Sequence, residues 1–232
     1  MNQTVKNEWT QLMKKMPLLF FGFFLYALGI LTSVYANLGM SPWGVFHMGI
    51  SNYTPFTLGQ VTQLFGLLIL VISYLMGVMP GLGSIFNMIF IGAFIDLIEL
   101  LGILRTPGTL MGQIIMLLVG VFISGWATYF YLQVHLGAGP RDGLMEGLVR
   151  KLQKPVWKIR GVIEFTVLSI GFLLGGPVGL GTLVTATTIG FSVQFAFKIG
   201  KYDPRSVQHT NLTELMTKLS GHKLPEETVG HK

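Results

Sequence analysis

A short segment that occurs twice constrains the fold more than any other feature of this sequence. The segment LGMSPWG at 38–44 returns 98 positions later as LGAGPRD at 136–142. The same offset pairs Gly81 with Gly179 and Gly83 with Gly181. Glycines often hold backbone positions that other residues rarely adopt, so one offset shared by many of them indicates two copies of one unit.

The two copies consist largely of apolar segments. The chain is 51% hydrophobic and only 11% charged, against roughly 25% charged for an ordinary soluble domain. Its apolar runs reach the roughly 20 residues that a helix needs to cross a bilayer core of about 30 Å. The sequence therefore predicts an all-α integral membrane protein with about six transmembrane helices, three in each copy. The expected spans are 17–38, 57–76, 83–101, 111–136, 156–174 and 181–198.

Basic residues predict how the chain is placed across the membrane. We divide it into a polar segment 1–16, membrane repeats at 17–104 and 105–200, and a polar tail at 201–232. Lys and Arg gather before the first span, between the fourth and fifth spans and after the sixth, which favours the cytoplasm for both termini. With three spans per copy the second repeat is inverted relative to the first. Many secondary transporters have this architecture.

Three local features add structural expectations. Pro17 is expected in the first turn of the first helix. Asp96 lies close in sequence to Arg105, and an ion pair at the membrane interface would account for it. The tail has helical apolar spacing, which indicates an amphipathic helix. The apolar positions of that helix are Leu212, Leu215, Met216 and Leu219.

Each Leu-Gly-x-x-Pro motif is expected to end one helix and begin another. Ser41 or Gly139 suits the N-cap, and proline suits the first helical position. The structural residues of the motif and of the later Gly-Leu-Gly are Gly39, Pro42, Gly137, Pro140, Gly81, Gly83, Gly179 and Gly181. The segments 42–52 and 140–152 are too short to span, so they are either half-helices that dip into the membrane or interfacial helices. A dipping half-helix would offer backbone N–H groups to an anion, whereas a tight turn would only allow close packing.

Three charged residues are the main candidates for a substrate site. Arg141 and Asp142 follow the second motif, and they become costly and functionally significant if that segment re-enters the membrane. If it is a cytoplasmic loop, their charges carry little meaning. Glu164 lies two turns into the fifth span and is the best single intramembrane acid. Its spacing from Arg160 also allows a simple pair on the helix surface.

Weaker candidates are polar residues at equivalent positions of the two copies. Asn87 corresponds to Thr185, and Tyr35 corresponds to Gln133. Ser84 lies on the same helix face as Asn87, whereas Asp96 lies on the opposite face. A threonine hydroxyl that bonds its own backbone is the simple alternative for Thr185.

Several function classes lack support. The absence of cysteine excludes disulfides, thiolate metal sites and a cysteine nucleophile. His47 and His135 have no ligand-like spacing with other donors, so no metal site is expected. Phosphate loops, nucleophile elbows and zinc-protease motifs are absent. The net charge of +6 fits membrane topology better than nucleic-acid binding. We expect no enzyme activity and no cofactor.

The duplicated Leu-Gly-x-x-Pro with the later Gly-Leu-Gly-Thr at 179–182 resembles the YczE/YyaS/YitT family of bacterial membrane proteins. The resemblance covers about residues 17–200, and Gly-Pro-Arg-Asp-Gly at 139–143 is its most specific part. It implies a bacterial inner-membrane protein, and members of the family have been connected to production or export of secondary metabolites. Trp43 replaces the arginine in the first copy, so any role of Arg141 and Asp142 belongs to the second copy.

The repeats, the helix breaks and the few intramembrane charges together predict a small secondary transporter or permease. It would move a small organic solute through a cavity between the inverted halves. The alternative is a membrane accessory or substrate-capturing subunit of a larger system. Besides the lipid bilayer, the partners considered are a small-molecule substrate, a membrane protein and a second copy in a homodimer.

Overall fold

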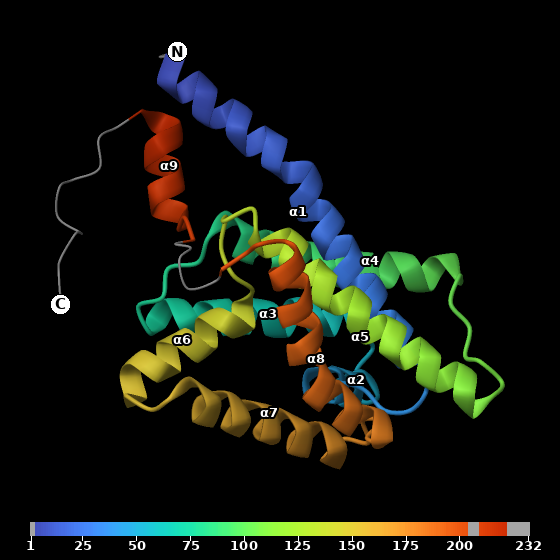
Figure 1. Cartoon of the computed structure of the whole chain (residues 1–232). Helices are drawn as coiled ribbons and strands as arrows, with labels where there is room; N and C mark the ends of the chain where they lie inside the picture. The colour runs from blue at the N-terminus through green and yellow to red at the C-terminus, as the bar shows by residue number, and fades with distance from the viewer. Residues whose placement is uncertain (1–2, 204–208, 222–232) are drawn as a thin grey trace.

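The computed structural model describes residues 3–203 and 209–221, and every regular element in this part of the chain is an α-helix. Figure 1 shows the long α1 beside α5, with α9 near the N-terminal end of α1. The helices are α1 (Gln3–Tyr35), α2 (Pro42–Ser51), α3 (Leu58–Leu75), α4 (Leu82–Leu101), α5 (Leu110–Leu132), α6 (Pro140–Leu152), α7 (Val156–Leu173), α8 (Leu180–Ile199) and α9 (Leu212–Ser220). The predicted all-α class is confirmed.

The two copies have the same backbone plan. The offset of 98 residues carries both ends of α3 onto those of α7, both ends of α4 onto those of α8, and the start of α2 onto the start of α6. Positive φ angles recur at the same positions, with 104° at Gly39 and 122° at Gly137. Asn37 and His135 also share a positive φ. The repeated sequence therefore corresponds to repeated structure.

Five helices are long and apolar enough to cross a membrane, namely α1, α3, α4, α5 and α8. The remaining expected span, α7, has 18 residues but contains Lys158, Arg160 and Glu164. Large apolar side chains are exposed along these helices, such as Leu67 at 50% and Phe191 at 72%. Such extensive exposed apolar surface fits contact with lipid. The chain is a multi-pass membrane protein.

Helices α1 and α5 form the central pair, and they run antiparallel. A Cβ placed on Gly29 would collide with the backbone of Ser124, and one on Gly120 would collide with the backbone of Ser33. Ser33 and Ser124 also bond carbonyls one turn back in their own helices. Small residues let the two backbones approach closely. This packing stabilises helix pairs in membranes, where the hydrophobic effect does not drive helices together because lipid is itself apolar.

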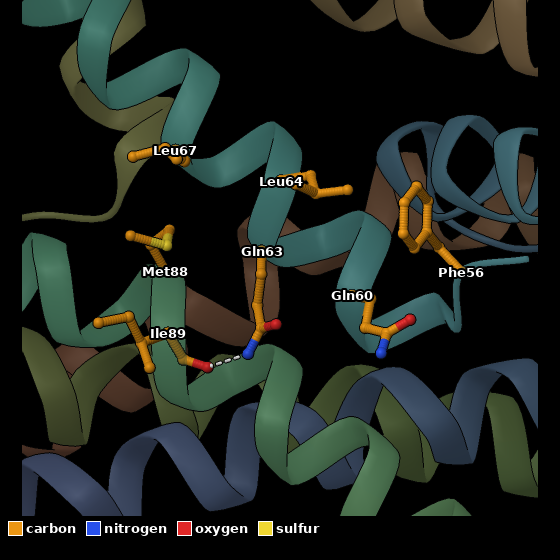
Figure 2. A pocket seen from close by; sticks show the side chains of 7 residues that line it. All are labelled: Phe56, Gln60, Gln63, Leu64, Leu67, Met88 and Ile89. Atoms are coloured by element: carbon orange, nitrogen blue, oxygen red, sulfur yellow. Dashed lines mark hydrogen bonds between the residues drawn. The ribbon is translucent and has the colours of Figure 1, made fainter. Parts of the chain in front are cut away.

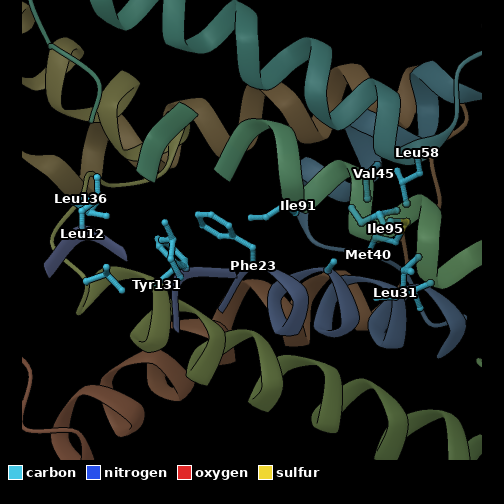
Figure 3. Packing of buried hydrophobic residues seen from close by; sticks show 14 of the residues in the cluster. Leu12, Phe23, Leu31, Met40, Val45, Leu58, Ile91, Ile95, Tyr131 and Leu136 are labelled. Carbon is cyan, nitrogen blue, oxygen red and sulfur yellow. The ribbon is translucent and has the colours of Figure 1, made fainter. Parts of the chain in front are cut away.

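The buried core lies beside this central pair (Figure 3), and many partly buried aromatic side chains pack against it. Phe23 is fully buried and its ring lies 5.8 Å from that of Tyr131. Phe20 packs edge-on against Phe90 of α4, with ring centroids 4.6 Å apart. Edge-to-face pairs of this kind contribute about 0.5–1.5 kcal/mol beyond area burial. The core thus joins α1 to both α4 and α5.

Each short helix packs on the other half of the molecule. Gly171 of α7 lies against the backbone of Phe46 in α2, and Gly49 of α2 lies against the Gly171 carbonyl. In the same way, Gly147 of α6 lies against Met76, just beyond the end of α3. The two halves therefore interlock through α2 and α6.

The halves differ where α3 meets α4. A Cβ on Gly59 or on Gly92 would collide with the backbone of the other helix, and Gln63 donates to the Ile89 carbonyl at 2.7 Å (Figure 2). The equivalent residues of the second half are Trp157, Gly190 and Gly161. Gly190 has open space around it, and α7 and α8 make little contact. The half without this contact has Trp157 where the first half has Gly59.

Two local expectations are wrong. Pro17 lies inside α1, which begins near Gln3, because a single missing N–H does not end a helix that packs along its length. Asp96 accepts hydrogen bonds from the Thr57 hydroxyl at 2.7 Å and the Gly59 N–H at 3.1 Å. It therefore caps the N-terminus of α3 rather than pairing with Arg105.

The predicted tail helix is present as α9. Asn211 caps it by accepting from the Glu214 N–H at 2.8 Å, and Leu215 is buried in the core cluster with Leu12 of α1. Backbone hydrogen bonds from Thr210 and Leu212 reach the carbonyls of His135 and Pro80. The end of the tail, 222–232, lies outside the described residues.

Candidate functional site

The two repeated motifs form interlocking turns between the halves. The Gly181 N–H donates to the Leu38 carbonyl at 2.6 Å, and the Gly83 N–H donates to the Leu136 carbonyl at 2.7 Å. A Cβ on Gly39 would collide with the backbone of Gly179, and one on Gly137 with the backbone of Gly81. These glycines are therefore required for the close approach of the two turns, as expected if each motif is a tight turn.

Proline and the N-cap residues start both short helices as predicted. Pro42 and Pro140 are the first residues of α2 and α6. The Ser41 hydroxyl accepts from the Gly44 N–H at 3.3 Å, whereas Gly139 offers no side chain to α6. The N-terminus of α6 therefore keeps the positive end of its dipole, although the Asp142 N–H already donates to the Gly139 carbonyl.

Side chains from the first turns of α2 and α6 meet. The guanidinium of Arg141 lies over the Trp43 ring, 4.6 Å from its centroid. These residues occupy equivalent positions of the two copies, so the site lies between the two halves. A cation over an indole face is attracted by about 0.5–2 kcal/mol.

Arg141 has no hydrogen bond or ion pair with any residue that the structure describes. Its side chain is partly buried. Its electrostatic neighbours are Tyr26, Asp142, Tyr131 and Glu164. Two aromatic residues of the central helix pair thus stand beside a guanidinium whose donors are unmatched within the protein.

Asp142 is exposed to solvent although it lies in the first turn of α6 at this junction. Its carboxylate accepts from the Gly139 N–H, which satisfies one backbone donor of α6. A Cβ on Gly139 would lie 3.5 Å from the Asp142 carboxylate and 3.6 Å from the Asn87 amide. Asn87 therefore belongs to the same site, and Ser84 one turn earlier donates to the Ala138 carbonyl.

Glu164 is paired with Arg160, with 2.9 Å between the Arg160 Nε and a Glu164 carboxylate oxygen. The predicted helix-surface pair is confirmed. The side chains are 31% and 58% exposed, and pairs so open to solvent contribute little to stability. Because charged groups avoid lipid, this face of α7 requires a polar environment. Asp142 interacts electrostatically with Arg160 as well.

The other candidates lie apart from this cluster. Tyr35 and Gln133 stand at the C-terminal ends of antiparallel helices, so the two residues cannot share one site. Thr185 is buried, and its hydroxyl has no partner in the described part of the chain. It lies one turn beyond Thr182, beside which the first motif packs. Thr185 therefore faces the first motif, whereas Asn87 faces the second.

The structure adds His47, one turn after Trp43 in α2. The His47 Nδ1 lies 3.0 Å from the Thr62 hydroxyl, which itself donates to the Leu58 carbonyl. Nδ1 therefore carries the proton, and the buried Nε2 is an acceptor without a partner in the described residues. Only tertiary packing reveals this, because the sequence signal is a lone histidine in an apolar segment.

Two pockets lie away from Arg141. An apolar groove of about 400 Å³ runs between α3 and α4, lined by Phe56, Leu64, Leu67 and Met88 with two glutamines (Figure 2). A second pocket of about 330 Å³ lies at the first motif. Its residues include Asn37, Met40, Asn52 and Pro177. At the equivalent turn of the second half, the C-terminal segment lies over His135 instead.

No group of three or more His, Asp or Glu side chains within 3–203 and 209–221 is placed to hold a metal ion. The groups at the junction of α2 and α6 are instead suited to binding an organic molecule. They offer guanidinium donors, carboxylate acceptors and aromatic faces.

Comparisons with known proteins agree with this description. The chain is 37% identical over 191 residues to an uncharacterized protein of Haemophilus influenzae strain Rd, covering 82% of this chain and 87% of that one. It is 33% identical to the uncharacterized membrane protein YczE of Bacillus subtilis strain 168, over 91% and 92% of the two chains. YyaS of the same strain is 27% identical over 71% of this chain and 83% of its own. No solved structure matches.

The resemblance to YczE and YyaS is thus confirmed. A family of unknown function, DUF6198, matches residues 13–198 and so includes both motifs, the helices from α2 to α7 and all of α8 but its last residue. The chain belongs to this family.

Proposed function

We propose that this protein is a small secondary transporter for an organic solute, built from two inverted three-helix repeats that include α7 as a sixth span. The substrate would bind where side chains from the first turns of α2 and α6 meet. The observation that carries the proposal is Arg141, an unmatched guanidinium held on Trp43 at the contact between the halves. Charged groups inside a membrane protein commonly mark substrate pathways.

Three features support the architecture. Helices α1 and α5 are antiparallel equivalents, short helices interrupt each half, and each half packs on the other through α2 and α6. Transporters with inverted repeats bind substrate at such helix breaks near the midplane. The distribution of basic residues favours the cytoplasm for both termini, and the family resemblance supports a bacterial inner membrane.

The test begins with the purified full-length protein and a panel of amines, acids, nucleobases and peptides. A solute that binds the folded state raises the melting temperature by mass action. Uptake of the binding solute is then measured in proteoliposomes. Arg141→Ala and Glu164→Gln are expected to abolish uptake while both variants remain folded. Arg150→Ala, at the far end of α6, is the control and is expected to transport normally.

The opposite outcome points to the second function class. If no solute binds or enters, and a membrane protein co-purifies in a fixed ratio, the chain is an accessory subunit. Normal uptake in Arg141→Ala would remove the junction of α2 and α6 from consideration.

A further inference from the structure

The described protein supplies no hydrogen-bond acceptor to the Arg141 guanidinium, so its donors are left to solvent or to a ligand. A guanidinium carries five N–H donors in a planar fork. Trp43 lies 4.6 Å from it and has no acceptor to offer. Glu164 already binds Arg160 at 2.9 Å, and Asp142 accepts from the backbone of Gly139. Neither acid makes an ion pair with Arg141.

The N-terminus of α6 adds to the positive potential at this place. Arg141 follows directly on Pro140, the first residue of α6, whose N-cap is a glycine. Trp43 is the second residue of α2 and contacts Arg141 through its side chain. The dipole of α6, on which Arg141 itself lies, favours an anion beside the guanidinium.

A second unmatched polar atom lies close by. The Nε2 of His47 is buried without a partner among the described residues, and its ring is 6.0 Å from that of Trp43. His47 lies in the middle of α2. Because its Nε2 is an acceptor, a carboxylate cannot satisfy it, whereas a hydroxyl on the ligand, as in lactate, can donate to it.

The charges of the cluster limit how much negative charge the ligand carries. Arg141 and Arg160 are balanced by Asp142 and Glu164, all within electrostatic range of one another. A single anionic group can bind the unmatched guanidinium, but a second one would meet two carboxylates. Of the aromatic neighbours, Tyr26 and Trp43 are partly buried and offer ring surface that suits an uncharged body, whereas Tyr131 is buried in the core.

We infer that Arg141 binds the carboxylate of a small organic monocarboxylate, with the body of the ligand against Tyr26 and Trp43. Carboxylate matches the guanidinium fork in a planar, bidentate pair, which a lysine cannot reproduce. The inference rests on the proposed function because it names the substrate class of the same site.

The experiment uses the full-length protein in detergent with acetate, propionate, lactate and benzoate. The corresponding amides are matched neutral probes, and succinate is the doubly charged probe. At least one monocarboxylate is expected to raise the melting temperature saturably, while its amide and succinate do not. Calorimetry of that pair then provides the dissociation constants.

Variants connect binding to the guanidinium. Arg141→Gln is expected to abolish binding, and Arg141→Lys is expected to weaken it at least tenfold because the fork is lost. Arg150→Gln is the control and should bind normally. If Arg141→Gln does not fold, Arg141→Lys and the comparison of acid with amide decide whether the guanidinium binds the carboxylate. Equal binding of acid and amide, binding that survives in both Arg141 variants, or no bound monocarboxylate would overturn the inference.

Failure of this inference differs from failure of the proposed function. A monocarboxylate that binds through Arg141 but never enters proteoliposomes would retain the site and contradict transport. Uptake of a neutral or cationic solute without carboxylate binding would retain transport and contradict the substrate class.

Discussion

Single glycines decide which helices touch in this protein. Gly92 of α4 packs against the Gly59 carbonyl and the Gln63 side chain, whereas its equivalent in the second half, Gly190, has nothing within 4 Å. The same residue type at the same repeat position thus serves a tight contact in one half and none in the other. Whether the glycine forms a tight contact depends on Gly59, whose equivalent in the second half is Trp157.

Alanine at these two positions is expected to have opposite effects. In Gly92→Ala the new Cβ would meet the Gly59 carbonyl, and overpacking of this kind costs about 1–3 kcal/mol. In Gly190→Ala the space is open, so the better helix propensity of alanine adds up to about 1 kcal/mol. Melting temperatures of the purified variants measure both. Equal losses would show that α8 is packed as tightly as α4.

Residue-level features were predictable when their cause is local. The spacing of Arg160 and Glu164, the cap at Ser41 and the prolines at helix starts involve neighbours along the chain. The capping of α3 by Asp96 joins residues 39 positions apart, and the contact of Arg141 with Trp43 joins the two halves. No local pattern reveals such pairs, so the candidate site was predicted as separate residues rather than as a cluster.

At the level of elements, the repeat made most helix boundaries predictable, because the motif that begins a helix occurs in both copies. The exceptions are the first and fourth spans, expected at 17–38 and 111–136, whose helices end at Tyr35 and Leu132, and the start of α1. Helix α1 extends through Pro17 to Gln3, since α9 and the core give its first turns something to pack on. The polar composition of 1–16 does not show this, because tertiary packing supplies the stability.

The cap on α3 makes Asp96→Asn a test of element stability. The carboxylate accepts from the Thr57 hydroxyl and the Gly59 N–H, whereas an amide offers only one accepting atom. The loss is expected to cost about 1–3 kcal/mol, lowering the melting temperature by several degrees. Gln194→Ala, at the equivalent exposed position of α8, is the control. An unchanged melting temperature in Asp96→Asn would contradict the cap.

Docking of the tail is expected to depend on pH through two histidines outside the spanning segments. Burial lowers the pKa of His209, and the nearby His135 lowers it further. Burial and then Lys15 lower the pKa of His135. Because both pKa values are lower when docked, docking is fully stable above the ordinary histidine pKa of about 6.5 and weakens as the pH falls below it.

Maleimide labelling measures this dependence. Leu215→Cys probes the buried face of α9 and Met216→Cys its exposed face, so the ratio of their rates removes the pH dependence of the thiol. The ratio is expected to rise as the pH falls from 7 towards about 5. Adding His135→Gln and His209→Gln should flatten the curve. A rise that persists in the double variant would assign it to other groups.

At the scale of the molecule, the two halves have corresponding helices that pack differently. The third and fourth helices of the first half are packed together, whereas α7 and α8 of the second half are separated. Sequence repetition predicted the shared plan. It did not predict the difference, because this depends on contacts that Gly59, Gln63 and Gly66 make and that Trp157, Gly161 and Glu164 do not.

Cysteine cross-linking tests this asymmetry, since the chain has no native cysteine. A Cβ on Gly66 would lie 3.3 Å from the Met88 Cβ, near the spacing that a disulfide needs. The pair Gly66→Cys with Met88→Cys is therefore expected to oxidise readily in membranes. The equivalent pair, Glu164→Cys with Ala186→Cys, is expected to remain reduced because α7 and α8 are apart. Equal oxidation of both pairs would mean that the second half also adopts the packed arrangement, and the asymmetry would then describe one of two interchanging states.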